Sequence, residues 1–349
     1  MKIQKFFFPT AVLFLLTALT LPSYRHDDNA KNISDVPVPV ILDCDLGSST
    51  DDLFSMMMLY NAHREGKVDF KALMIDRAGL DNLRVADIFN TYYGFKTLPI
   101  GKTHDAPKNP PVFIPYWKMA KPEEFPEMPD FKRSYTDDEL SQLPDAEILY
   151  RQILAEAPDS SVVMFLTGFP VNIAHLLETK ADNISELDGV SLVAKKVKAL
   201  YLMGGDLTHD SPEPEYNLKQ DSENALVMMN NWPVAIYFSP GETGQKIDYI
   251  PERVIADQSA QNLSDSPLCM VYKLFDCNTG QRMWDACAVE QFLHPEFFEL
   301  HGPVGYAVDT DMILHEYPGT YHFMTYTKTA AQDTAILNDI RMTAHGGLR

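Results

Sequence analysis

Positive charge is scarce in this sequence, which has 29 lysine and arginine residues against 49 aspartate and glutamate residues. The formal net charge of its 349 residues is -20 at pH 7. Proteins that bind nucleic acids or anionic membranes contact phosphate groups with clustered basic side chains. The charge balance therefore argues against nucleic acid and anionic membranes as partners, although it identifies no substrate.

Cysteine is also rare, and the four cysteines of the chain are too few for a disulfide scaffold of this size. Cys44 lies within an acidic stretch, whereas Cys269, Cys277 and Cys287 follow one another late in the chain. One disulfide among the last three cysteines could form in an oxidising compartment, but the spacing does not show which two would pair.

A long apolar run occurs once, near the start, where it begins at Phe6 after Lys2 and Lys5. This layout is typical of a secretory signal. We expect residues 1–22 to be a signal peptide and residues 23–36 to be a flexible lead-in, which predicts export by a bacterium to the periplasm or the medium. Cleavage of the signal and its retention as an anchor are both open. No second run is long enough to cross a membrane, so we expect no stable membrane association after cleavage.

Short apolar runs alternate with helical patterns from Val38 onwards. The expected strands cover residues 38–43, 69–75, 162–166, 198–203 and 233–238. The expected helices cover residues 51–65, 82–94, 144–156, 171–180, 221–231, 265–276 and 286–293. This alternation predicts a Rossmann-like α/β fold, with a mostly parallel sheet flanked by helices, and we expect residues 37–349 to form a single domain.

Two segments depart from this alternation. Residues 103–143 contain many prolines with aromatic residues between them, which predicts a long surface excursion that forms a lid or a rim. The last fifty residues place Gly302, Gly305 and Gly319 between β-rich pieces, which predicts a small antiparallel appendage.

The first expected strand ends in a dense acidic group. The four carboxylates within ten residues are Asp43, Asp45, Asp51 and Asp52. Ligands of α/β folds bind beyond the carboxyl ends of the strands, and crowded acids repel one another unless a cation or donors compensate them. Oxygen ligands favour Ca²⁺ or Mg²⁺. The alternative is an acidic turn that starts the next helix, with Ser49 or Thr50 as its N-cap.

Three later strands also open into glycine and polar residues, at Thr167-Gly168, at Gly204-Gly205-Asp206 and at Ser239-Pro240-Gly241. Glycine lets the backbone approach a ligand closely. Because the carboxyl ends of parallel strands lie at one edge of the sheet, these turns and the acidic group outline a single rim.

At this point the motifs resemble those of a known family. Asp43-Cys44-Asp45-Leu46-Gly47, followed by Asp51-Asp52, resembles the aspartate signature of nucleoside hydrolases. Further matching segments are Thr167–Ala174, Tyr201–Gly205, Glu215–Asn217 and Trp284-Asp285. Their order agrees over residues 38–295, so the chain is identified as a member of the inosine- and uridine-preferring nucleoside hydrolase superfamily, in a divergent exported bacterial branch.

The resemblance implies Ca²⁺-dependent hydrolysis of the N-glycosidic bond of a nucleoside or related ribosyl compound, which gives free sugar and base. It implies that Asp45, Asp52, Asp285 and the backbone carbonyl of Val171 bind Ca²⁺. Asp45 would also be the catalytic base that takes a proton from the attacking water.

The resemblance also implies a substrate site. Asp51 would accept a hydrogen bond from the 2-hydroxyl of the sugar, Glu215 and Asn217 would hold the far hydroxyls, and Trp284 would lie beside the base. The alternatives are that Glu215 and Asn217 only cap the following helix and that Trp284 is a packed core aromatic.

Two departures from the family pattern affect the leaving group and the sugar. Trp284 replaces a histidine, so the general acid is not identified, and Asp76-Arg77-Ala78 replaces a glycine-asparagine pair that contacts ribose in the family. Two other functions stay open, namely hydrolysis of a different glycoside and a non-catalytic calcium-holding protein that binds nucleosides or sugars. The base preference and a homo-oligomeric state are open as well.

Overall fold

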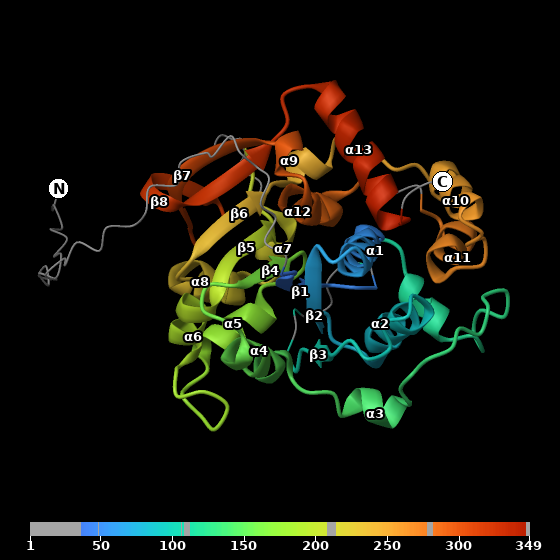
Figure 1. Ribbon diagram of the computed structural model, residues 1–349, viewed down its shortest axis with the longest axis horizontal. Helices are drawn as coiled ribbons and strands as arrows, with labels where there is room; N and C mark the ends of the chain where they lie inside the picture. The colour runs from blue at the N-terminus through green and yellow to red at the C-terminus, as the bar shows by residue number, and fades with distance from the viewer. Residues whose placement is uncertain are drawn as a thin grey trace, which may run out of the picture. The chain divides into compact units, whose positions relative to one another are not determined.

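The computed structural model describes residues 36–47, 49–105, 107, 112–207, 214–277 and 282–346 (Figure 1). The expected signal peptide and all but the last residue of the expected lead-in lie outside these ranges. Within them, no helix is long and apolar enough to cross a membrane.

The described residues form an eight-stranded sheet in the order β3-β2-β1-β4-β5-β6-β8-β7. The strands are β1 (Val38–Cys44), β2 (Val68–Ile75), β3 (Ile100–Lys102), β4 (Val162–Leu166), β5 (Val197–Met203), β6 (Ala235–Ser239), β7 (Glu299–Val308) and β8 (Leu314–Tyr326). All neighbouring strands pair in parallel except β7 and β8. The predicted α/β fold with a mostly parallel sheet is therefore confirmed.

Helices cover both faces of the sheet (Figure 1). The expected helices are α1 (Asp51–Arg64), α2 (Leu80–Tyr92), α4 (Ala146–Glu156), α5 (Val171–Glu178), α8 (Ser222–Asn231), α11 (Pro267–Leu274) and α12 (Trp284–Leu293). The structure adds η1 (Tyr116–Ala120), α3 (Asp137–Ser141), α6 (Gly189–Lys196), α7 (Tyr216–Gln220), α9 (Gly241–Gly244), α10 (Pro251–Ala260), η2 (Pro295–Phe297) and α13 (Ala330–Ala344).

Alternate residues of β1 enter two hydrophobic clusters. Val40 and Leu42 pack with buried residues of α1, α2 and α10 to α13, whereas Ile41 packs with residues of α4, α5, α6 and α8. Because successive side chains of a strand point to opposite faces, this partition places one cluster on each face of the sheet. A strand buried on both faces is apolar throughout, which explains why β1 was recognisable in the sequence.

The C-terminal strands correct one prediction. β7 and β8 do form an antiparallel hairpin, but β8 also pairs in parallel with β6, so the hairpin extends the main sheet and is not a separate appendage. Helix α13 follows and packs against α1, where the Asn61 amide donates to the carbonyls of Thr343, at 2.9 Å, and Ala344, at 3.0 Å. A long-range strand pairing of this kind leaves no local sequence pattern.

The proline-rich excursion is more than a surface segment. In its described part, Ile114, Tyr116 and Met119 are buried in the cluster that contains α1 and α2. The Tyr116 hydroxyl accepts a hydrogen bond of 2.7 Å from the amide of Gly47, which adopts a φ of 119°. That φ value lies in the region that favours glycine. The excursion therefore fixes the turn after β1 while it also borders the cavity described below.

The cysteines remain reduced in this structure. Cys44, Cys269, Cys277 and Cys287 are all free and buried. The disulfide that the sequence left open is therefore not formed.

Candidate active site

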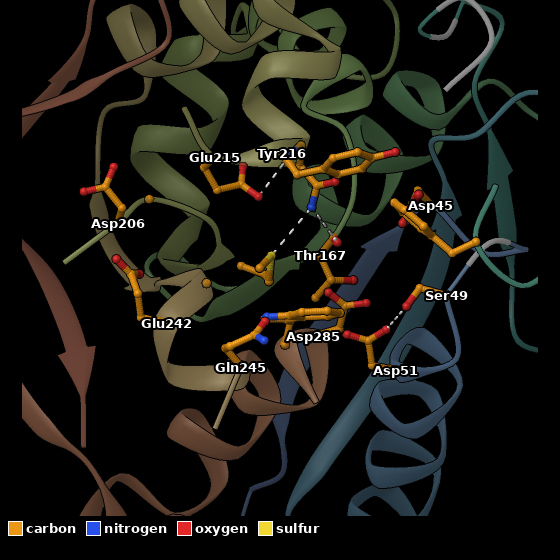
Figure 2. A pocket seen from close by; sticks show the side chains of 16 residues that line it. Asp45, Ser49, Asp51, Thr167, Asp206, Glu215, Tyr216, Glu242, Gln245 and Asp285 are labelled. Atoms are coloured by element: carbon orange, nitrogen blue, oxygen red, sulfur yellow. Dashed lines mark hydrogen bonds between the residues drawn. The ribbon is translucent and has the colours of Figure 1, made fainter. Parts of the chain in front are cut away.

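A cavity of about 710 Å³ opens at the carboxyl edge of the sheet, where the sequence outlined a rim (Figure 2). It is lined by residues that follow β1, β4, β5 and β6 and by residues from the starts of α7, α9 and α12. Of the predicted site residues, those that line it are Asp45, Asp51, Glu215, Asn217, Trp284 and Asp285. The fold thus gathers side chains that are up to 240 positions apart in the chain.

Three buried carboxylates, Asp45, Asp51 and Asp285, line one end of this cavity, and Asp52, which does not line it, lies beside them. Asp45 follows β1, Asp51 and Asp52 are the first residues of α1, and Asp285 lies in the first turn of α12. Asp51 accepts hydrogen bonds from the Ser49 hydroxyl and, at 3.1 Å, from the Asp285 amide. The amide bond links the starts of α1 and α12, which brings an early and a late aspartate together.

These carboxylates are poorly compensated by donors. Both side-chain oxygens of Asp52 are buried and have no hydrogen-bond partner among the described residues. Burial raises the pKa of Asp52 and of Asp285 well above the ordinary value, and the neighbouring carboxylates raise each pKa further. Burial also raises the pKa of Asp51 to about 6. Buried oxygens without donors, on a group made only of carboxylates, fit a hard cation such as Ca²⁺.

Arg77 was not assigned a role from the sequence, yet it binds the central aspartate. Its guanidinium donates to the Asp45 carboxylate at 2.7 Å and to the Asp45 carbonyl at 3.1 Å, and both side chains are buried. Burial raises the pKa of Asp45, and the positive charge of Arg77 opposes that increase. The signal in the sequence was its position directly after β2, at the same edge of the sheet as Asp45.

Val171 does not line the cavity. It is the first residue of α5 and is fully buried, whereas the residue at the cavity wall is Thr167, directly after β4. The Thr167 carbonyl accepts a hydrogen bond of 3.2 Å from the Asn217 side chain. Val171 is thus not among the residues that line the cavity, and binding of Ca²⁺ by its backbone carbonyl stays a prediction.

Glu215 caps a helix, and both Glu215 and Asn217 lie at the cavity, so their role towards the sugar stays a prediction. Glu215 caps α7, because its carboxylate accepts from the amides of Asn217 at 3.0 Å and Leu218 at 2.9 Å. Both Glu215 and Asn217 also line the cavity. Burial raises the pKa of Glu215 to about 7. The cap thus fixes a carboxylate at the wall of the site.

Trp284 lies at the cavity and is not part of either hydrophobic cluster. It begins α12, is packed against Gly244 of α9, and lines the cavity. A side chain at position 244 would have its Cβ 2.4 Å from the Trp284 Cα, so only glycine permits this approach. Asp206 and Glu242 line the cavity on the side opposite Asp45 and Asp51 (Figure 2).

The raised pKa values predict that the calcium-free protein loses stability as the pH rises. Asp51, with a pKa of about 6, and Glu215, with a pKa of about 7, bind protons in the folded state that the unfolded chain has already released. The free energy of unfolding should therefore be highest near pH 4 to 5 and fall towards pH 7. Each unit by which the pKa of a group is higher in the folded than in the unfolded chain contributes about 1.4 kcal/mol to this fall. Urea unfolding of calcium-free protein at pH 5 and pH 8 measures this difference. Equal stabilities would contradict it.

Comparisons with known proteins identify the family. The family model described as inosine-uridine preferring nucleoside hydrolase matches residues 40–338, so the chain belongs to that family. The membership that the motifs predicted is thereby confirmed, and the protein is a hydrolase that acts on N-glycosyl bonds. Members of this family depend on a metal ion. Among curated proteins, none matches the sequence significantly.

Solved structures share the fold at low sequence identity. The inosine-uridine preferring nucleoside hydrolase from Bacillus anthracis is 13% identical, with a TM-score of 0.63 over 88% of this chain and 99% of that one. The purine-preferring ribonucleoside hydrolase from Gardnerella vaginalis is 13% identical, with a TM-score of 0.64 over 88% and 99%. The type III effector protein XopQ, complexed with adenosine diphosphate ribose, is 12% identical, with a TM-score of 0.66 over 90% and 95%.

Proposed function

We propose that this protein hydrolyses the N-glycosidic bond of a nucleoside or related ribosyl compound in a Ca²⁺-dependent reaction. The observation that carries the proposal is that Asp45, Asp51 and Asp285 line one end of a cavity, with Asp52 beside them and its oxygens buried without hydrogen-bond partners among the described residues. A protein that only bound a nucleoside would not need a carboxylate placed to accept a proton from water. The cavity volume of about 710 Å³ is within the range of small-molecule sites.

The oxygen chemistry of these residues fits a calcium ion, and Asp45, Asp52, Asp285 and the backbone carbonyl of Val171 would hold it. In the described structure no three of the aspartates have carboxylate oxygens within 4.8 Å of one another, so their side chains would draw together around the ion. A bound Ca²⁺ supplies positive charge that orients the attacking water and makes that water more acidic. Asp45 accepts the proton that the water loses as its oxygen bonds to the anomeric carbon. The bond from that carbon to the base nitrogen breaks, its electron pair leaves with the base, and the base takes up a proton from solvent while Asp45 later returns its own to solvent.

The sugar and the base occupy different parts of the cavity in this proposal. Asp51 accepts a hydrogen bond from the 2-hydroxyl, while Glu215 and Asn217 hold the far hydroxyls. Fixing the ring in this way favours the flattened, cation-like state from which the base departs. Trp284 lies beside the base, and the acidic wall around Glu242 suits a base that presents N–H donors.

The substrate class is tested by release of free sugar from a panel of purine and pyrimidine ribonucleosides, each beside its 2-deoxy counterpart. We expect release from at least one ribonucleoside and much slower release from its deoxy partner, which lacks the hydroxyl for Asp51. ADP-ribose belongs in the panel because the similar XopQ structure contains it. Release only from a different glycoside would favour the first alternative. Tight binding without any release would favour the non-catalytic alternative.

Arg77 is expected to compete with the metal ion for Asp45. Replacing it in Arg77→Gln removes a positive charge that lies 2.7 Å from the Asp45 carboxylate. We expect the calcium affinity to rise about tenfold, or about 1.4 kcal/mol, a fraction of the ~4 kcal/mol between unit charges 4 Å apart at an effective dielectric constant of 20. Calorimetric titration with Ca²⁺ measures the change. Arg77→Lys, which keeps the charge, is the control, and an unchanged affinity in Arg77→Gln would show that Arg77 does not compete.

Export and the domain boundary rest on the sequence alone. We propose that residues 1–22 direct export from a bacterial cell and that the hydrolase acts outside the cytoplasm, supported by the lysine-led apolar run at the start of the chain. The single domain over residues 37–349 and a homo-oligomeric state stay predictions.

A further inference from the structure

A second group of potential metal ligands lies outside the cavity. His104 follows β3, Glu147 lies in the first turn of α4, and His175 lies in α5. One ligand atom from each of these residues lies within 4.8 Å of the other two. Among the described residues, no other group of three or more histidine, cysteine, aspartate or glutamate side chains has ligand atoms this close together. None of the three residues lines the cavity of the active site.

Hydrogen bonding within the protein does not account for this arrangement. The Nδ1 atom of His175 and the Oε2 atom of Glu147 are buried and have no hydrogen-bond partner among the described residues. The two imidazole rings are stacked, with centroids 4.5 Å apart and planes 11° apart, so the rings do not donate to each other. The closest contact between ring and carboxylate, from His104 Nδ1 to Glu147 Oε1, is 3.4 Å. A buried polar atom without a partner is costly, which points to a missing ligand.

We propose that His104, Glu147 and His175 form a second metal site, which binds a divalent transition-metal ion of the zinc type. Two imidazoles and one carboxylate are a common zinc ligand set, with the remaining position left to water. Imidazole nitrogen suits zinc and its neighbours, whereas calcium prefers an all-oxygen set. The chemistry of the ligands therefore separates this site from the aspartate group.

The local charge favours a cation at this position. Asp145 lies 3.8 Å from His104 Nδ1, and its other carboxylate oxygen is held at 3.0 Å by Lys102. Glu147 and Asp145 both belong to the start of α4, so two carboxylates face one half-exposed imidazole. A bound ion would neutralise part of this negative charge, and the unpartnered atoms of Glu147 and His175 would become its ligands.

The position of the site suggests what the ion does. Glu147 and His175 lie in α4 and α5, whereas His104 is the second residue of the proline-rich excursion over residues 103–143. An ion held by all three would tie the start of that excursion to the helices that cover the sheet. Because Phe113 of the excursion lines the active-site cavity, the ion would help to set the position of one wall of the cavity.

Isothermal titration of the full chain with Zn²⁺ tests the proposal. The protein carries no histidine tag and is first saturated with Ca²⁺, so that the aspartate group is occupied. We expect the wild type to bind one zinc ion per chain. His104→Gln, Glu147→Gln and His175→Gln should each lower the zinc affinity at least about tenfold, the lower end of the loss seen when a supporting group of a metal site is removed. His104 is half exposed, so its replacement leaves the core intact. X-ray absorption should show nitrogen ligands at about 2.0–2.1 Å.

Two control variants make the result specific. His301→Gln removes an exposed histidine that pairs with Glu316 at 2.7 Å and has no third ligand, and it should bind zinc as the wild type does. Asp52→Asn tests whether zinc enters the aspartate group, and it too should leave zinc binding unchanged. Three results would overturn the proposal. They are absence of zinc binding in the wild type, zinc affinity equal to that of the wild type in all three ligand variants, and loss of zinc binding only in Asp52→Asn. None of these results depends on whether the enzyme hydrolyses nucleosides.

Discussion

Asp45→Asn is expected to lower kcat by a factor of about 10²–10⁴, the usual contribution of a general base, while the substrate still binds. Asparagine keeps an oxygen towards the metal but cannot accept the proton of the attacking water. The measurement is the rate of sugar release at saturating substrate and saturating Ca²⁺, beside a direct binding titration of the same nucleoside. Saturating Ca²⁺ is needed because Asp45 would also be a metal ligand.

Asp159→Asn is a matched control for that substitution. Asp159 is an exposed aspartate that pairs with Lys196 at 2.9 Å on the surface, so its replacement makes the same chemical change away from the cavity. We expect its kcat to equal that of the wild type. Turnover by Asp45→Asn close to the wild-type rate would contradict the assignment of Asp45 as the catalytic base.

Asp52→Asn is expected to have opposite effects on the protein with and without calcium. With calcium, the variant loses a charged ligand, and its calcium affinity should fall by at least about 100-fold, the upper end of the loss seen when a supporting group is removed. Without calcium, the substitution removes a buried carboxyl that has no hydrogen-bond partner in the described structure, so the free energy of unfolding should rise. Calcium titrations and urea unfolding with and without the ion measure both effects.

Glu290→Gln separates the metal effect from the burial effect. Glu290 is another buried carboxyl without a hydrogen-bond partner among the described residues, and burial raises its pKa to about 10, so it is protonated at neutral pH. It does not line the cavity. Its replacement should therefore leave calcium affinity unchanged. An Asp52→Asn variant that binds calcium as tightly as the wild type would show that the metal site has been placed wrongly.

The sequence predicted the central part of the fold because the relevant signals were local. The strands from β1 to β6, apart from β3, are apolar runs that stop at glycine or acidic residues, and such runs are readable one at a time. β3 has only three residues, which is too short to show a pattern. β8 pairs with β6 across more than eighty positions of sequence, and no local feature records that pairing.

The sequence predicted those cavity-lining residues that belong to a motif at the end of a strand or the start of a helix. Asp45, Asp51 and Asp285 stand at the ends of elements, so once the elements are arranged their positions follow. Arg77 could not be assigned a partner, because the contact with Asp45 depends on how two neighbouring strand ends bend towards each other. Val171 was assigned by resemblance within the turn after β4, and the role of its backbone carbonyl as a calcium ligand stays a prediction, whereas Thr167 of the same turn lines the cavity.

The excursion shows a further limit of sequence reasoning. Proline and aromatic residues indicated an irregular segment, but not that Tyr116 would be buried and bound to Gly47. A side chain that fills a gap in the core carries no mark in the sequence that separates it from an exposed one. Burial of this kind depends on the neighbouring surface, here the turn after β1 and helix α2.

The most direct test of calcium-dependent hydrolysis is release of reducing sugar by the wild-type enzyme from its best ribonucleoside, measured in excess Ca²⁺, after removal of Ca²⁺ by a chelator, and again after Ca²⁺ is restored. We predict turnover in the first sample, loss of turnover in the second and recovery in the third, with the rate following calcium binding. Turnover that persists at the same rate in calcium-free protein would contradict the central claim, because the aspartate group would then act without the ion that it fits.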